Sequence, residues 1–125
     1  KYRYDVIIFK QDTHMLEYSC IAAAYAALYF SDTFRSDVQI LLPLVYHVPL
    51  ITCMNNLHAG IYAGNALYCE PAPQQIAEKM MLIYKDEDLR NRLAGTYRQL
   101  ASGCTWANTA TNLWASITGS ASQTA

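Results

Sequence analysis

The sequence lacks the residue spacings that typically mark metal sites and disulfide frameworks. No two of its four cysteines form a Cys-x-x-Cys pair, and its three histidines are scattered between them. Zinc sites and disulfide-rich domains need closer and more regular spacing. We therefore expect neither a metal site nor a resident cofactor. Free thiols, expected to be buried, indicate a reducing compartment, and so a cytoplasmic protein.

An excess of charge of one sign is also missing. Nine basic residues against ten acidic ones give a formal charge of −1, so nucleic acid is not an expected partner. The range Val38–Cys69 contains no Asp, Glu, Lys or Arg, which indicates an interior segment, whereas Lys79–Arg98 is dense in both signs. The most apolar run, Val38–Ile51, is interrupted by Pro43 and Pro49 and is too short to span a bilayer. No signal peptide is recognisable.

What the chain does have is enough apolar sequence to form one domain with a core. It has 125 residues, of which 53% are hydrophobic. It starts at Lys1 without an initiator Met and enters a predicted strand almost at once. We expect the amino-terminal part of the fold to be absent.

The hydrophobic pattern predicts strands that alternate with helices. The predicted strands are Tyr4–Phe9, Ala26–Phe30, Leu50–Cys53 and Ala66–Cys69. Helices are predicted around Met15–Ile21, from a start between Val38 and Leu41 with Pro43 in the first turn, over Leu57–Ala63, and after Pro73. This alternation implies right-handed crossovers and an α/β fold with a parallel sheet covered by helices on both faces.

The carboxyl-terminal part is predicted to be helical. Asp86 can cap a helix whose buried stripe is Leu89, Leu93, Tyr97 and Leu100, and Thr105 can cap a last helix. The residues of that last helix expected to pack inward are Trp106, Ala110, Leu113, Trp114 and Ile117. Core positions are also predicted for Tyr18, Tyr25, Tyr29, Tyr46, Met80 and Met81. The expected domain is 1–118, followed by a flexible tail at 119–125.

Five segments in this order resemble a known family. They are Pro49-Leu-Ile, Gly64-Asn-Ala-Leu-Tyr, Pro73-Gln-Gln-Ile-Ala-Glu-Lys-Met, Asp86-Glu-Asp-Leu-Arg-Asn-Arg-Leu and Thr105-Trp. Their order and spacing resemble the carboxyl-terminal domain of GT-B glycosyltransferases of the "glycosyl transferases group 1" class. The leading Asp5-Val-Ile-Ile-Phe and the range Leu16–Ser31 resemble the same domain. The resemblance covers nearly the whole chain.

The resemblance implies a Rossmann-like, partial GT-B domain with carboxyl-terminal helices packed alongside the sheet. In the family this domain holds a nucleotide-diphosphate sugar that faces a second, acceptor-binding domain. The complete polypeptide is then expected to transfer a hexosyl group to a glycan or lipid-type acceptor. The present chain, without an amino-terminal acceptor domain, is expected to be inactive by itself, and no catalytic residue is assigned to it.

The family's pair of glutamates eight positions apart falls here on Phe34 and Leu42. Neither side chain can accept a hydrogen bond, and no glutamate occurs between Glu17 and Glu70. Ribose hydroxyls left without acceptors cost about 1–3 kcal/mol for each unsatisfied group. The alternative function is therefore a pseudo-glycosyltransferase domain that keeps the fold and serves as a scaffold or partner-binding module.

Polar residues beside these two positions are the candidates for substrate binding. Arg35, Ser36 and Asp37 replace the glycines of the family's loop, and Arg35 offers a guanidinium to a phosphate. Asn55 and Asn56 follow a predicted strand and suit a sugar or a phosphate. The same residues are also ordinary in solvated loops and turns, so both interpretations stay open.

Overall fold

A small parallel sheet lies at the centre of the protein. The computed structural model describes residues 14–30, 38–53 and 60–121. Its strands are β1 (Ala27–Tyr29), β2 (Leu50–Thr52) and β3 (Leu67–Tyr68), paired in the order β1-β2-β3 with both pairs parallel. The three corresponding predicted strands and the α/β class are confirmed. The predicted strand Tyr4–Phe9 lies outside the described residues.

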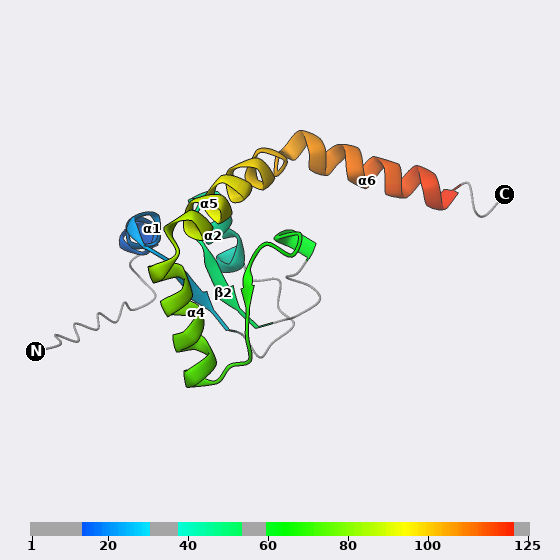
Figure 1. Ribbon diagram of the computed structural model, residues 1–125. Coiled ribbons are helices and arrows are strands. Elements are labelled where there is room, and N and C mark those ends of the chain that lie inside the picture. Colours follow the sequence, from blue (N-terminus) through cyan, green and yellow to red (C-terminus); the bar gives the residue numbers. More distant parts are fainter. Residues whose placement is uncertain (1–13, 31–37, 54–59, 122–125) are drawn as a thin grey trace, which may run out of the picture.

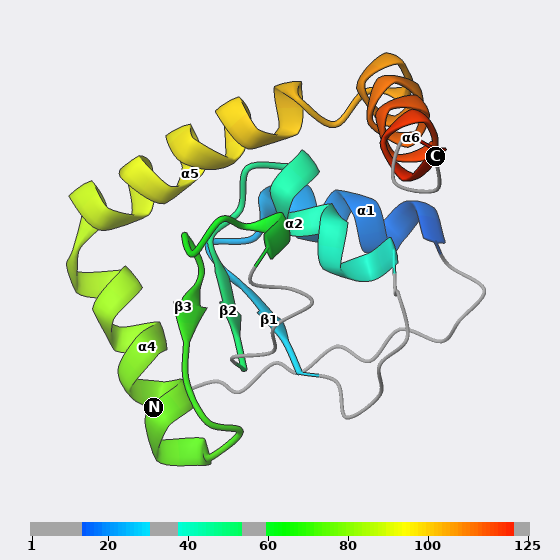
Figure 2. The same cartoon turned by 90° about the vertical axis from the view of Figure 1, so that its right-hand side faces the viewer.

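Helices connect and cover the strands (Figures 1 and 2). They are α1 (His14–Ala23), the short 3-10 helix η1 (Val38–Leu41), α2 (Leu42–Val45), α4 (Pro73–Lys85), α5 (Glu87–Ser102) and α6 (Trp106–Ala121). Helical structure begins within the predicted range, at Val38, but as the 3-10 helix η1, and the α-helix itself begins at Leu42. Pro43 lies in the first turn of α2, as predicted, where a missing N–H leaves no hydrogen bond unmade. The predicted caps at Asp86 and Thr105 are also confirmed: Asp86 Oδ1 accepts from the Leu89 N–H at 2.8 Å, and Thr105 Oγ1 accepts from the Asn108 N–H at 3.1 Å.

The turn before β3 shows why the sequence has Gly64-Asn65 there. Gly64 has a φ of +75°, a left-handed conformation that glycine adopts without steric cost. The Asn65 side-chain amide donates to the carbonyl oxygens of Tyr62 at 3.1 Å and Ala63 at 3.0 Å. The Tyr62 carbonyl also accepts from the Asn65 backbone N–H at 2.9 Å, so Asn65 closes the turn with both its backbone and its side chain. The predicted closing pair Gly64-Asn65 is therefore confirmed. The predicted helix that it closes lies partly outside the described residues, which resume at Gly60.

The core lies on both faces of β2. Leu50 packs with Ile40 of η1 and Leu44 of α2, and all three are almost completely buried. Because side chains alternate along a strand, Ile51 points to the opposite face. There α4 contacts β2, and its Ile83 is also fully buried. Described residues of the segment without charges therefore supply much of the interior, as its composition predicts, although Val45 and Tyr46 are exposed.

Two buried tyrosines join α5 to the elements around the sheet. The Tyr97 hydroxyl accepts from the Leu50 N–H at 3.2 Å and donates to the Asn65 carbonyl at 3.0 Å. Its ring meets that of Tyr62 edge to face, with ring centroids 5.0 Å apart. The Tyr62 hydroxyl donates to the Ile40 carbonyl. Burial raises the pKa of Tyr97 to about 12 and also raises the pKa of Tyr62.

The last helix differs from its prediction. The structure exposes Trp106 at 89% and Trp114 at 68%, and Leu113 and Ile117 are exposed as well. The helix extends away from the sheet (Figure 1), so the inward-packing prediction is wrong. It also continues through Ala121, so the predicted tail at 119–125 begins too early.

Other predicted core positions need the same correction. Met80 and Met81 of α4 are each 48% exposed, and Tyr18, Tyr25 and Tyr46 are also at the surface. The hydrophobic pattern identifies residues that prefer burial, but it does not show whether another element covers them. Among the described residues, the fully buried tyrosines are Tyr62 and Tyr97, and Tyr29 is partly buried against the core.

Replacing Tyr97 by Phe tests the hydroxyl that joins Leu50 to Asn65. Tyr97→Phe removes the acceptor for one buried N–H and the donor to one carbonyl, so we expect the free energy of unfolding to fall by about 1–3 kcal/mol. Urea unfolding followed by circular dichroism measures this change. Tyr84→Phe is the matched control, because Tyr84 is 71% exposed, and it should leave the midpoint unchanged. Equal midpoints for the two variants would contradict the role given to Tyr97.

The raised pKa of Tyr97 predicts a loss of stability in alkali. An unfolded tyrosine ionises near 10, whereas folded Tyr97 keeps its proton to about 12. The contribution of this proton to the free energy of unfolding should therefore be constant below pH 10 and fall between pH 10 and 12, by up to about 1.4 kcal/mol per pH unit. Urea titrations across this range measure the slope. It should be shallower in Tyr97→Phe, and Tyr62, Tyr68 and Cys69, whose pKa values are also raised, contribute to the remaining slope. An unchanged slope would argue against burial of the Tyr97 hydroxyl.

Tryptophan fluorescence tests the placement of α6, because both tryptophans of the chain lie in it. Because both side chains are exposed, we expect the emission maximum of a hydrated indole. We also expect acrylamide to quench this emission nearly as strongly as it quenches free tryptophan amide. Trp106→Phe and Trp114→Phe report on each residue separately, and Trp106 should be quenched more because it is more exposed. A blue-shifted, protected emission would mean that α6 packs inward after all.

Candidate functional site

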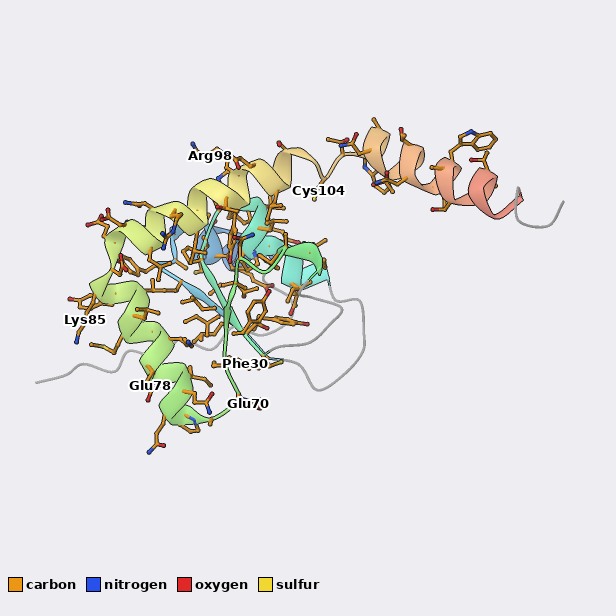
Figure 3. The ribbon with its side chains drawn as sticks, turned by 45° about the vertical axis from the view of Figure 1, so that its right-hand side comes forward. Phe30, Glu70, Glu78, Lys85, Arg98 and Cys104 are labelled. Carbon is orange, nitrogen blue, oxygen red and sulfur yellow. The ribbon has the colours of Figure 1, made fainter. Side chains whose placement is uncertain are left out.

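The carboxyl ends of the strands define the edge where open α/β folds bind ligands. Figure 3 shows Phe30, which follows β1, and Glu70, which follows β3, at the same end of the sheet. The polar candidates predicted for this edge, together with one of the two motif positions, lie outside the described residues. They are Phe34, Arg35, Ser36, Asp37, Asn55 and Asn56. The structure therefore does not test whether these six residues come together.

Leu42 is the one predicted site position that the structure describes. It lies at the first turn of α2 and lines a cavity of about 320 Å³ along the outer side of β1. Volumes of this size are typical of small-molecule pockets. The lining comes from Glu17, Cys20 and Ile21 of α1, Ala24 and Ala26 after it, Ala27, Leu28 and Tyr29 of β1, Gln39 of η1, and Leu42 and Pro43 of α2.

Glu17 and Gln39 are polar residues of this cavity that the sequence did not identify. Glu17 supplies a carboxylate from α1 to the same lining as the apolar side chain of Leu42. In the sequence, Glu17 looks like an ordinary residue in the first turn of a helix, where a negative charge is favoured. Gln39 lies in an apolar run and gives no signal of its own. Only the packing of α1 beside η1 and α2 brings the two residues to one cavity.

The charges around this cavity do not favour a phosphate. Its lining contains a carboxylate and no Lys, Arg or His. A diphosphate needs cationic side chains or a set of free backbone N–H groups. Within the described part of the chain, this cavity therefore offers a place for an apolar or hydroxylated group. Any cation for a phosphate would have to come from elsewhere, as Arg35 could provide.

Two neighbouring residues near the carboxyl edge carry buried hydroxyls. Thr52 and Tyr68 are register partners on β2 and β3. Thr52 Oγ1 and the Tyr68 hydroxyl are both buried and have no hydrogen-bond partner among the described residues. Burial raises the pKa of Tyr68, so its hydroxyl remains a donor at neutral pH. Buried hydroxyls of this kind are usually satisfied by water or by a ligand.

A second cavity is almost entirely apolar. It has a volume of about 480 Å³ and is lined by Tyr25, Ala26, Met80, Met81, Ile83 and Tyr84. The Arg90 guanidinium lies 4.5 Å from the centre of the Tyr25 ring, a cation–π contact that holds the ring in place. Exposed apolar side chains gathered in this way commonly mark an interaction surface.

The cysteines are less buried than predicted. Cys20 and Cys104 are exposed, and Cys53 and Cys69 are half-buried, so the expectation of buried thiols is wrong for all four. No group of three or more His, Cys, Asp or Glu residues able to hold a metal occurs among residues 14–30, 38–53 and 60–121. Likewise, no helix in this described part is long and apolar enough to cross a membrane.

Comparison of the chain with models of known protein families gave no match, and comparisons with curated proteins and with solved structures gave none either.

Proposed function

We propose that this chain is the donor-binding half of a GT-B type glycosyltransferase, which holds a nucleotide-diphosphate sugar for transfer of its hexosyl group by a larger polypeptide. The proposal is supported by the order of elements: the strand, crossover and strand sequence of β1, α2 and β2 is followed by β3 and the helices α4, α5 and α6. This order is the one that the sequence resemblance implies. A cytoplasmic location belongs to the same proposal.

The position of Leu42 is the observation that carries the proposal. The family's second glutamate falls on this residue, and Leu42 lines a ligand-sized cavity at the first turn of the helix that follows β1. A motif position placed by chance would have no reason to face a cavity. We therefore take the cavity beside β1 as part of the donor site. In it, the apolar side chain of Leu42 replaces the carboxylate that accepts hydrogen bonds in the family.

The uncovered apolar surfaces agree with a missing acceptor half. The exposed face of α6 and the apolar cavity between Tyr25 and α4 leave large side chains in water. A second domain is the kind of partner that would cover such surfaces. Within this proposal the isolated chain has no transferase activity, because transfer also needs the acceptor-binding domain.

Leu42 also favours a second candidate function, a pseudo-glycosyltransferase domain. Leu42 cannot accept a hydrogen bond from a ribose hydroxyl, and the cavity lining has no cation for a phosphate. A domain of this kind would keep the fold and bind a protein partner instead of a donor. The two candidates differ in whether the unmodified chain binds a nucleotide.

Calorimetric titration with nucleoside diphosphates and their sugars tests the proposal. The double variant Phe34→Glu/Leu42→Glu restores both carboxylates at the motif positions. It should bind at least one nucleoside diphosphate about tenfold to a hundredfold more tightly than the unmodified chain, since each restored hydrogen bond is worth roughly 1–3 kcal/mol. Val45→Glu/Tyr46→Glu is the matched control, because it adds the same charge at two exposed positions at the other end of α2.

The outcomes separate the two candidates. Micromolar binding by the unmodified chain would mean that other residues, such as Arg35 or Asn55, have taken over donor recognition. Binding gained only in the double variant would favour the pseudo-glycosyltransferase. If neither protein binds any nucleotide while circular dichroism shows both folded, the donor-site assignment is wrong.

A further inference from the structure

Two of the four cysteines end neighbouring strands of the sheet. Cys53 follows Thr52, the last residue of β2, and Cys69 follows Tyr68, the last residue of β3. Thr52 and Tyr68 are register partners, and the Cys69 N–H donates to the Thr52 carbonyl at 3.0 Å, so the parallel pairing continues to the cysteines. Cys53 and Cys69 are therefore adjacent across the two strands.

The geometry of a parallel pair brings the two thiols to the same face. Register partners project their side chains to one side of a sheet, and neighbouring strands lie about 4.7–4.9 Å apart. This separation falls within the range of about 4.4–6.8 Å between Cα atoms that disulfides require. Both residues lie just beyond the regular strands, where small backbone adjustments are easiest, and both are partly accessible to solvent.

The electrostatics of Cys69 agree with this placement. Burial raises its pKa, the neighbouring Cys53 and Glu70 raise it further, and Lys79 of α4 acts in the opposite direction. Cys53 is thus close enough for one sulfur to influence the ionisation of the other. The other two thiols stand apart: Cys20 is exposed on α1, and Cys104 lies at the junction of α5 and α6 (Figure 3).

We propose that Cys53 and Cys69 form a redox-active dithiol, which is oxidised reversibly to an intramolecular disulfide by a small-molecule disulfide such as glutathione disulfide. One thiolate attacks the oxidant, forming a mixed disulfide and releasing one glutathione thiolate, which takes up a proton. The second cysteine, after losing its proton to solvent, attacks the mixed disulfide and releases the second glutathione. Two protein thiols are oxidised and one glutathione disulfide is reduced to two glutathione molecules.

The disulfide would close a loop that contains the connection between β2 and β3 together with β3 itself. This connection leads from the carboxyl end of one strand through Tyr62 and Asn65 to the next strand, and so it contains part of the core. Oxidation is therefore expected to raise the stability of the chain, because it restricts the unfolded state. The inference is independent of the proposed function and would stand if no nucleotide bound.

The test uses two matched double variants of the full chain. Cys20→Ser/Cys104→Ser keeps the proposed pair, and Cys53→Ser/Cys69→Ser keeps the two separate thiols. Each is equilibrated with glutathione disulfide and glutathione, quenched with acid, and examined by mass spectrometry and thiol titration. The first variant should lose both thiols together, without a glutathione adduct, and its peptides should show the 53–69 link. The second should accumulate glutathione adducts.

The folded state must be responsible for the pairing. In concentrated urea the ratio of intramolecular disulfide to mixed disulfide in the first variant should fall by about tenfold or more, since the strands no longer hold the thiols together. The oxidised protein should also show a higher unfolding midpoint than its reduced form. Glutathione adducts on both Cys53 and Cys69 of the folded protein, or a ratio unaffected by urea, would overturn the proposal.

Discussion

The hydroxyl of Tyr97 is the contact on which the arrangement of the elements depends. It accepts from the backbone N–H at the start of β2 and donates to the carbonyl of Asn65, just before β3. A three-residue strand between two others makes few ladder hydrogen bonds, so a sheet this small depends on its helices. Through one side chain, α5 fixes β2 and the turn that leads to β3, while Tyr62 connects that turn to η1.

The contacts of Tyr97 and Tyr62 explain why the part of the molecule around them is well packed and other parts are not. The cluster around Leu50 and Tyr97 is closed by η1, α2 and α5. Away from this cluster, apolar side chains are left in water at three places. These are the cavity beside β1, the α4 cavity with Met80 and Met81, and the face of α6. A 16-residue helix rich in Thr, Asn and Ser is only marginally stable without packing. Covering these surfaces would therefore stabilise the chain as a whole.

Local pattern predicted most of the elements, but not what covers them. Features that depend on a few neighbouring residues were correctly predicted. They are the uncharged strand Leu50–Thr52, the proline at the start of α2, and the caps at Asp86 and Thr105. The periodicity of α6 identified its apolar face correctly, yet burial depends on a partner that periodicity cannot show. Similarly, Glu17 reaches the cavity only through the packing of α1, and nothing in its local sequence indicates this.

The carboxyl edge carries two chemistries at adjacent positions of the sequence. On one face of β2 and β3, Thr52 and Tyr68 present buried hydroxyls, and on the other face Cys53 and Cys69 present thiols. Alternation along the strands makes this separation necessary, because residues one position apart point to opposite faces. A ligand that reached the hydroxyls would therefore not contact the thiols directly.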